Sequence, residues 1–209
     1  MIGGVMRVFA GILAYIMLLA SVFFLSGCAT LENRAGEDGP DYLELANFDS
    51  MLEVNDFDGS LFGYWNGFPE DITQKCEFTF FDPGRDGNGS SLKIIYNVDS
   101  PRVAYNGFWM LFKALDFKSY SKLTFWAKTE SRRVSPGNFK MELKNENKKA
   151  IAKVFNGLDT EWQKFEIDFT ENAFMQDWKS ITEFVIVFEK DEVDHKRGIL
   201  FIDDIALER

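Results

Sequence analysis

Short stretches in which apolar and polar residues alternate occur along most of the chain from residue 74 onward. In residues 139–144 every second residue is apolar, so the apolar side chains fall on one face of a strand. Residues 184–188 are apolar throughout, which indicates a strand that is covered on both sides. From this pattern and the abundance of Phe, Ile, Val, Tyr and Trp we predict strands at residues 74–81, 90–97, 106–112, 122–129, 138–145, 150–155, 162–169, 183–189 and 199–208.

Clusters of Gly, Pro, Asp and Asn separate these stretches and indicate turns. The densest clusters are residues 82–89 and 135–138, and residues 170–178 predict one short helical turn capped by Thr170. Many short strands at this spacing, without alternating helices, predict an all-β, antiparallel β-sandwich. The 22 Phe residues of the chain give such a sandwich ample core material.

The N-terminus has the pattern of a bacterial lipoprotein signal. Arg7 precedes a long apolar run over residues 8–25, and the run ends in Leu-Ser-Gly-Cys at residues 25–28. These four residues resemble a lipobox, which predicts cleavage after residue 27 and acylation of Cys28. The run is also long enough for a plain transmembrane anchor, which is the alternative. Two or three acyl chains on one cysteine hold a protein firmly to a membrane.

Residues 1–27 are thus expected to be a signal peptide, residues 28–44 a flexible tether and residues 45–209 the folded domain. The tether is rich in Asn, Gly, Asp, Glu and Pro and offers little apolar surface to bury. We expect the protein to be exported and lipid-anchored to the cell envelope. Ala29 follows the cysteine, where an Asp would retain an enterobacterial lipoprotein in the inner membrane, so the outer membrane is favoured where one exists.

Charge and reactive residues restrict the chemistry. The net charge of −10 disfavours nucleic acid and anionic lipid headgroups as partners. Cys76 has no cysteine partner once Cys28 is acylated, and its alternating context indicates a small buried residue rather than a nucleophile. The single histidine, His195, lies in a charged stretch before the last predicted strand. A single histidine cannot form a histidine-rich metal site. The sequence also contains no nucleophile motif, which argues against a Ser-His-Asp catalytic set.

Eight motifs in a fixed order carry a family resemblance that spans residues 46–208. They are NFDS at 47–50, GYWN at 63–66, SLKIIY at 91–96, NGF at 106–108, LDFKSYSKLTFWAK at 115–128, EWQKF at 161–165, TEF at 182–184 and FIDDI at 201–205. This order resembles the galactose-binding-like jelly rolls, and within them the family 11 carbohydrate-binding modules and the complex I intermediate-associated protein 30 domains. The resemblance implies a two-sheet antiparallel jelly roll, a structural calcium ion, and a sugar site on the concave face or at the loops.

Aromatic residues in or beside loops are the candidates for sugar binding, because carbohydrate recognition pairs ring faces with sugar C–H groups. Tyr64 and Trp65 lie in a Gly-flanked segment, and Tyr105 and Trp109 flank another glycine. The alternative is that these rings fill the core or its ends.

Two further groups of residues have a structural and a functional interpretation. Trp126 and Trp162 fall in strand patterns, which favours packing in the core or on a sheet face over ligand binding. A charged set could line one sheet face and bond sugar hydroxyls, or be an ordinary solvated face. Its members are Arg132, Arg133, Lys140, Glu142 and Lys144.

Calcium needs several oxygen ligands brought together by loops. Asp49, Asp203 and Asp204 stand at positions that supply such ligands in the families the chain resembles. Adjacent strand residues point to opposite faces, so at most one of Asp203 and Asp204 is expected to bind directly, with Asp203 preferred. Two solvent-facing or capped acids are the alternative. Residues 82–88 resemble a loose calcium loop, but a hairpin turn accounts for them better.

The leading functional hypothesis is a membrane-anchored, non-catalytic lipoprotein that captures a glycan. The second hypothesis is a protein-interaction or assembly factor on the same fold, because one fold serves many functions. A small glycoside-processing enzyme ranks third, since it would need two carboxyl groups facing each other across a cleft.

Overall fold

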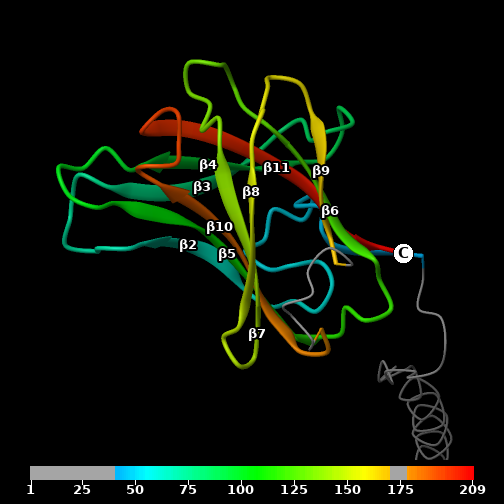
Figure 1. The fold of residues 1–209 in the computed structure, drawn as a ribbon. Coiled ribbons are helices and arrows are strands. Elements are labelled where there is room, and N and C mark those ends of the chain that lie inside the picture. The colour runs from blue at the N-terminus through cyan, green and yellow to red at the C-terminus, as the bar shows by residue number, and fades with distance from the viewer. Residues whose placement is uncertain (1–40, 170–177) are drawn as a thin grey trace, which may run out of the picture. The chain divides into compact units, whose positions relative to one another are not determined.

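The computed structural model describes residues 41–169 and 178–209, which form two antiparallel sheets packed face to face. The two layers are visible on the left of Figure 1, with β3, β4 and β11 in one and β2, β5 and β10 in the other. Across these two ranges, no helix is long and apolar enough to cross a bilayer.

The larger sheet has six strands in the order β3-β4-β11-β6-β9, with β1 paired to β11 beside this path. β11 is the longest strand and holds this sheet together, because it pairs with β1, β4 and β6. The strands are β1 (Tyr42–Ala46), β3 (Lys75–Phe81), β4 (Ser91–Asn97), β6 (Lys122–Lys128), β9 (Gln163–Asp168) and β11 (Arg197–Glu208).

The smaller sheet has five strands in the order β2-β5-β10-β7-β8, and every neighbouring pair is antiparallel. β2 and β8 are its edges, so β5 and β10 are paired on both sides. The strands are β2 (Phe62–Asn66), β5 (Tyr105–Leu115), β7 (Phe139–Asn145), β8 (Ala150–Phe155) and β10 (Ile181–Glu189).

Phenylalanine rings from both sheets fill the space between the layers. Phe62 of β2 meets Phe78 of β3 at 5.5 Å between ring centroids, and Phe125 of β6 meets Phe139 of β7 at 6.3 Å. Fully burying one such side chain contributes about 1.5–3 kcal/mol. These phenylalanine rings therefore pack mainly between the two sheets and hold them together. The outer faces of the sheets remain as candidates for function.

The all-β, antiparallel jelly-roll prediction is confirmed, and all nine predicted strands are present within a few residues of their expected bounds. Two strands were missed. β2 lies in a segment whose flanking glycines favour a loop, and β1 begins at Tyr42, inside the expected tether of residues 28–44. Glycine weakens a strand in isolation, so β2 depends on its partner strand β5, whose Trp109 covers Gly63.

Some predictions fall on residues that the structure does not describe. The signal peptide, the acylated Cys28 and most of the tether lie before residue 41, and the helical turn predicted at 170–178 lies almost wholly within 170–177. These remain predictions.

Candidate functional site

The outer face of the β2–β5 pair repeats one arrangement three times. At successive outward positions an aromatic residue of one strand stands opposite a glycine of the other. The repeat alternates between the strands, so the rings come from both. The three pairs are Gly63 with Trp109, Trp65 with Gly107, and Gly67 with Tyr105.

Each glycine provides the room for a ring to lie on the neighbouring strand. A Cβ atom on Gly63 would lie 2.7 Å from Cζ2 of Trp109, which is closer than real Cβ atoms approach. A Cβ atom on Gly67 would overlap the ring of Tyr105. The Trp109 indole is held in place by its Nε1–H, which donates to the Tyr64 carbonyl at 3.3 Å. The missing side chains let the rings pack against the sheet with their other side outward.

The third ring lies across β5. A Cβ atom on Gly107 would lie 3.2 Å from Nε1 of Trp65, so the indole covers this glycine. The Trp65 ring is 5.7 Å from that of Tyr105, and Tyr105 is 5.4 Å from Phe68. We call Trp65, Tyr105 and Trp109 the aromatic stripe. All three are half-buried, and none belongs to the core between the sheets.

Tyr64, the fourth predicted sugar ligand, does not join the aromatic stripe. Its Cα is paired with Phe108, whose ring is buried in the core, so Tyr64 points to the opposite side of β2. There its ring contacts Phe78 at 6.2 Å and stays 52% exposed because β2 is an edge strand. The structure therefore brings three of the four predicted rings together.

Sequence reasoning missed the aliphatic continuation of this surface. Leu61 and Leu111 extend the stripe beyond Trp109 and are 59% and 40% exposed. On the inner neighbour β10, Val185 and Val187 stand opposite Trp109 and Gly107. Leu61 lies two residues before Gly63 and Leu111 two residues after Trp109, so the two-residue period of a strand places both on the outer face once β2 and β5 are recognised as strands.

Beside the apolar part of this face lies a strip of linked charges on β7 and β10. Lys140 pairs with Glu142 at 3.1 Å and with Glu189, and Lys144 pairs with Glu183 at 3.5 Å. Burial lowers the pKa of Lys140, but its hydrogen bonds to Glu189 and Glu142 outweigh burial and raise it. These residues provide both donors and acceptors for hydroxyl groups.

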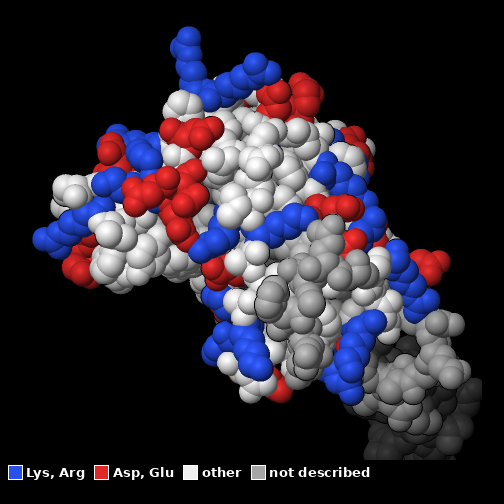
Figure 2. Space-filling view, viewed as in Figure 1, with Lys and Arg blue, Asp and Glu red and all other residues white. Residues whose placement is uncertain are grey.

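The other two members of the predicted charged set lie elsewhere. Arg132 and Arg133 are in the connection between β6 and β7, and Arg132 is bound to Asp159 through two nitrogen atoms. The prediction that Lys140, Glu142 and Lys144 share one sheet face is confirmed by their alternation on β7. Figure 2 shows that acidic and basic side chains are interspersed on the face in view.

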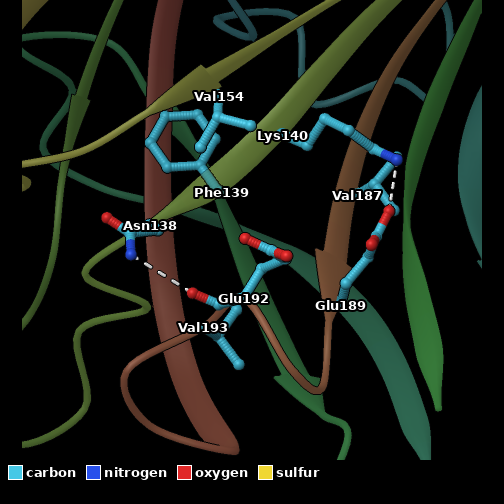
Figure 3. Close-up of a pocket in the computed structure, with 8 residues that line it drawn as sticks. All are labelled: Asn138, Phe139, Lys140, Val154, Val187, Glu189, Glu192 and Val193. Atoms are coloured by element: carbon cyan, nitrogen blue, oxygen red, sulfur yellow. Dashed lines mark hydrogen bonds and ion pairs between the residues drawn. The ribbon is translucent and has the colours of Figure 1, made fainter. Parts of the chain in front are cut away.

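A pocket of about 170 Å³ opens where β7, β8 and β10 meet the loop after β10. Figure 3 shows its polar side chains, which include the Lys140–Glu189 ion pair and the amide of Asn138, bonded to the carbonyl of Glu192 at 3.2 Å. Valines and one phenylalanine form the rest of its wall. The lining residues are Asn138, Phe139, Lys140, Val154, Val187, Glu189, Glu192 and Val193.

Two of the three predicted calcium ligands hold the same loop. Asp49 Oδ1 accepts from the backbone N–H of Ser90 at 2.8 Å, and Asp203 Oδ2 accepts from that of Arg85 at 2.8 Å. Asp203 is 4% exposed, and burial raises its pKa to about 7, with further contributions from the charges of Asp204 and Asp49. A buried carboxylate in this position would be stabilised by a cation.

Two oxygen atoms also lie close together at Gly84. A Cβ on Gly84 would lie 2.7 Å from the Asn88 carbonyl oxygen and 3.2 Å from Asp203 Oδ2, so two oxygen donors converge on one small space. The part of the chain that the structure describes has no group of three or more His, Cys, Asp or Glu side chains placed around a metal. Calcium here would take backbone carbonyls and water as its other ligands.

Asp204 is neutralised by a different partner. Its carboxylate pairs with Arg85 Nε at 2.5 Å, and the Arg85 guanidinium lies 4.6 Å from the centroid of Trp126. Asp204 has a φ of 47°, and the pairing of β11 shifts register just after Asp203. Regular alternation does not apply at this bulge, so both aspartates reach Arg85 instead of pointing to opposite faces.

The remaining residues of interest lie outside the aromatic stripe. Trp126 and Trp162 lie on the outer side of the six-stranded sheet, where Lys128 Nζ is 4.9 Å from the Trp162 ring. Cys76 is fully buried, and burial raises the pKa of its thiol to about 12, which leaves it unreactive. His195 is exposed in the loop before β11.

Comparison with solved structures shows which known folds this chain resembles. No sequence-family model matches the chain, and no curated protein matches it significantly. The family 11 carbohydrate-binding module of the cellulosomal cellulase Lic26A-Cel5E of Clostridium thermocellum is similar over 82% of this chain and 96% of its own, with 15% identity and a TM-score of 0.58. The chain has the fold of a family 11 carbohydrate-binding module.

Two other structures agree with this placement. A family 11 module from Clostridium thermocellum, in complex with a β-1,3-1,4-mixed-linked tetrasaccharide, has a TM-score of 0.59, 15% identity, and coverage of 82% of this chain and 97% of its own. A structure of carbohydrate-binding modules of the β-sandwich superfamily has a TM-score of 0.53, 10% identity, and coverage of 78% and 61%. The resemblance inferred from the order of the motifs is confirmed at the level of the fold.

Proposed function

We propose that this protein is a non-catalytic glycan-binding module, held to the cell envelope by acyl chains on Cys28. The observation that carries the proposal is the aromatic stripe: three rings, each lying over a glycine, on the outer face of the five-stranded sheet. Sugar rings present C–H groups on their faces, and an aromatic face is their usual partner. The charged strip beside the stripe supplies hydrogen-bond partners for the hydroxyl groups.

The stripe is long enough for an oligosaccharide. Its pairs repeat every two residues, which is about 6.8 Å along a strand, so Trp109 and Tyr105 are separated by roughly 14 Å. A chain of sugars can therefore contact all three rings at once. The structural neighbours with this fold are carbohydrate-binding modules, and one holds a mixed-linked tetrasaccharide.

A glycan array tests the proposal directly. The protein without residues 1–27 should bind at least one oligosaccharide among neutral β-glucans, xylans, agaroses and chitins, whereas the Trp65→Ala, Trp109→Ala double variant should bind none of them. Absence of binding across the whole array would contradict the proposed function.

Protein binding is the second candidate, and one group of residues favours it. Met51, Leu52, Leu61 and Leu111 are each at least 40% exposed near the β2–β5 end of the molecule and offer sugar hydroxyls no polar partner. Exposed aliphatic groups of this kind are typical of protein interfaces. A silent glycan array would favour this function over glycan binding.

The lipid anchor is part of the same proposal. Thirteen residues separate Cys28 from Tyr42, where β1 begins, and an extended chain of that length spans at most roughly 50 Å. Cys28→Ser should move the protein from the membrane fraction to the soluble fraction and abolish labelling by a palmitate analogue. Retention of the label by the variant would exclude Cys28 as the acylated residue.

We also propose a structural calcium ion at Asp49 and Asp203. Without metal, the folded chain binds a proton at Asp203 with a pKa of about 7, well above the ordinary value of 3.8. The contribution of Asp203 protonation to the free energy of unfolding is therefore fully present below about pH 4 and is lost as the pH rises through 7. In a chelator, the melting temperature of wild type should fall over this range relative to Asp203→Asn.

Calcium should reverse that loss where Asp203 is ionised. At pH 7.5 calcium should raise the melting temperature of wild type by several degrees, since only the folded state binds it. It should have little effect on Asp203→Asn. Identical melting curves with calcium and with chelator would rule out the calcium site, and identical pH profiles of the two proteins would rule out the titration of Asp203.

A further inference from the structure

The pocket bounded by β7, β8, β10 and the loop after β10 lies on the same sheet face as the aromatic stripe. In the register of the sheet, Val187 stands opposite Gly107, which the Trp65 indole covers, and Glu189 stands opposite Tyr105. Adjacent strands lie about 4.8 Å apart, so the pocket begins within two strands of the rings. A glycan on the stripe can reach into it.

The charges in the pocket are not balanced. Its one ammonium group, on Lys140, is neutralised twice, by Glu189 and by Glu142 at 3.1 Å. The carboxylate of Glu192 has no hydrogen bond or ion pair with any residue in the described ranges. Figure 3 shows this carboxylate directed toward the space between Phe139 and the Lys140–Glu189 pair. The pocket therefore contains one carboxylate without a counter-charge.

An ionised carboxylate only accepts hydrogen bonds, so its ligand must be a donor. The hydroxyl groups of a neutral sugar meet this requirement, whereas a uronate, sulfate or phosphate would bring a second negative charge next to Glu192. The valine and phenylalanine side chains around it, which include Val154 and Val193, suit the C–H groups of a sugar ring. A volume of about 170 Å³ is smaller than the 300 Å³ or more of pockets that enclose whole ligands, so it suits one unit of a longer ligand.

We propose that this pocket is a subsite for one uncharged sugar unit, that Glu192 accepts a hydrogen bond from a sugar hydroxyl there, and that Glu192 excludes anionic glycans. The proposal rests on the proposed function, because the aromatic stripe must hold the rest of the glycan. It adds a selectivity that the rings cannot provide, since a ring face does not distinguish a neutral sugar from its uronate.

Matched probes and charge variants test the subsite. The probes are the β-1,3-1,4-mixed-linked tetrasaccharide, or whichever neutral oligosaccharide binds most tightly on the array, and the same compound with its C6 hydroxyls oxidised to carboxylates. Affinities for both are measured by calorimetry for wild type, Glu192→Gln and Glu192→Lys. Asp191→Lys is the control, because Asp191 and Glu192 are both exposed and carry the same charge, but only Glu192 lines the pocket.

Wild type should bind the neutral probe at least about tenfold more tightly than the oxidised one, since like charges in an interface are strongly disfavoured. Glu192→Lys should lower the ratio of the affinity for the neutral probe to that for the oxidised probe by about tenfold or more. Glu192→Gln should give a ratio between those of wild type and Glu192→Lys. Asp191→Lys should leave the ratio within about threefold of wild type, because Asp191 does not line the pocket and its charge does not contact a sugar bound there.

The outcomes separate the two proposals. If the neutral probe binds but Glu192→Lys keeps the wild-type ratio, the subsite is wrong and the aromatic stripe stands. If Asp191→Lys changes the affinity ratio as much as Glu192→Lys does, only the net charge matters, and the subsite is again wrong. If no oligosaccharide on the array binds to wild type, the proposed function fails and the subsite fails with it.

Discussion

Replacing Trp65 and Trp109 together by alanine is expected to remove glycan binding almost completely. Both indoles lie over glycines on the outer face of the sheet, so each truncation leaves a residue without a side chain where the ring lay. Truncating an aromatic residue at the centre of an interface costs about 2 kcal/mol or more. That is roughly 30-fold in affinity for each residue and roughly 1,000-fold for the pair if the two losses add. Calorimetric titration with the best neutral oligosaccharide measures it.

The Trp126→Ala, Trp162→Ala double variant is the matched control. It also removes two half-buried indoles, but these lie on the outer side of the six-stranded sheet. Its affinity should stay within about threefold of wild type if binding energy is concentrated at the stripe. Equal losses in the two double variants would mean that general destabilisation, rather than a lost contact, explains the effect. Melting curves of both variants separate these explanations.

Gly107→Ala is expected to destabilise the fold strongly. A Cβ atom at this position would overlap the carbonyl oxygen of Ile186, which is backbone of β10, and would also press on Nε1 of Trp65 at 3.2 Å. β5 and β10 are adjacent strands that are each paired on both sides, and a backbone atom there cannot move away without breaking the ladder. We expect a loss on the order of 4 kcal/mol, which is well above a typical point substitution. Chemical denaturation measures it.

Two other glycines of the same face give the contrast. At Gly63 and Gly67 the three atoms nearest to an added Cβ all belong to the side chains of Trp109 and Tyr105, which can move more easily than backbone. Gly63→Ala and Gly67→Ala should therefore cost little stability, about 1 kcal/mol, but weaken glycan binding because the ring no longer lies flat. If Gly107→Ala were as stable as these two variants, the packing described for the β5–β10 pair would be wrong.

The fold was largely predictable because its strands carry their own local signal. The alternation in β7 and the apolar run in β10 correspond to a strand with one solvated face and a strand at the centre of a sheet. β2 lacked that signal, since two glycines in a short segment are typical of a loop. Its stability as a strand depends on rings from β5, more than 35 residues later in the chain, and no local pattern contains that information.

The candidate site was predicted in part for the same reason. Trp65, Tyr105 and Trp109 have glycine neighbours in the sequence, and these glycines make room for the rings on the outer face of the sheet. Tyr64 was chosen on the same grounds, but the strict alternation of a strand turns it to the other face. The complementary spacing, with glycine at 63 and 67 against aromatic residues at 109 and 105, would have predicted both the pairing and the face.

The pocket and the bulge at Asp203 could not be read from spacing. The pocket combines residues from three strands and a loop, and its free carboxylate depends on where Lys140 finds its partners. At Asp203 and Asp204, alternation predicted opposite faces, whereas a left-handed residue in the bulge turns both toward Arg85. Irregular backbone of this kind is set by the packing of distant segments.

The central claim, that the aromatic stripe is the surface that binds glycan, is tested most directly by the indole N–H signals of the tryptophans in a two-dimensional ¹H–¹⁵N spectrum. Trp65 and Trp109 report on the stripe, and Trp126 and Trp162 report on the opposite sheet within the same sample. On addition of the neutral oligosaccharide that binds best on the array, the signals of Trp65 and Trp109 should shift in a saturable way while those of Trp126 and Trp162 stay in place. Saturable shifts at Trp126 and Trp162, with Trp65 and Trp109 unmoved, would contradict the account.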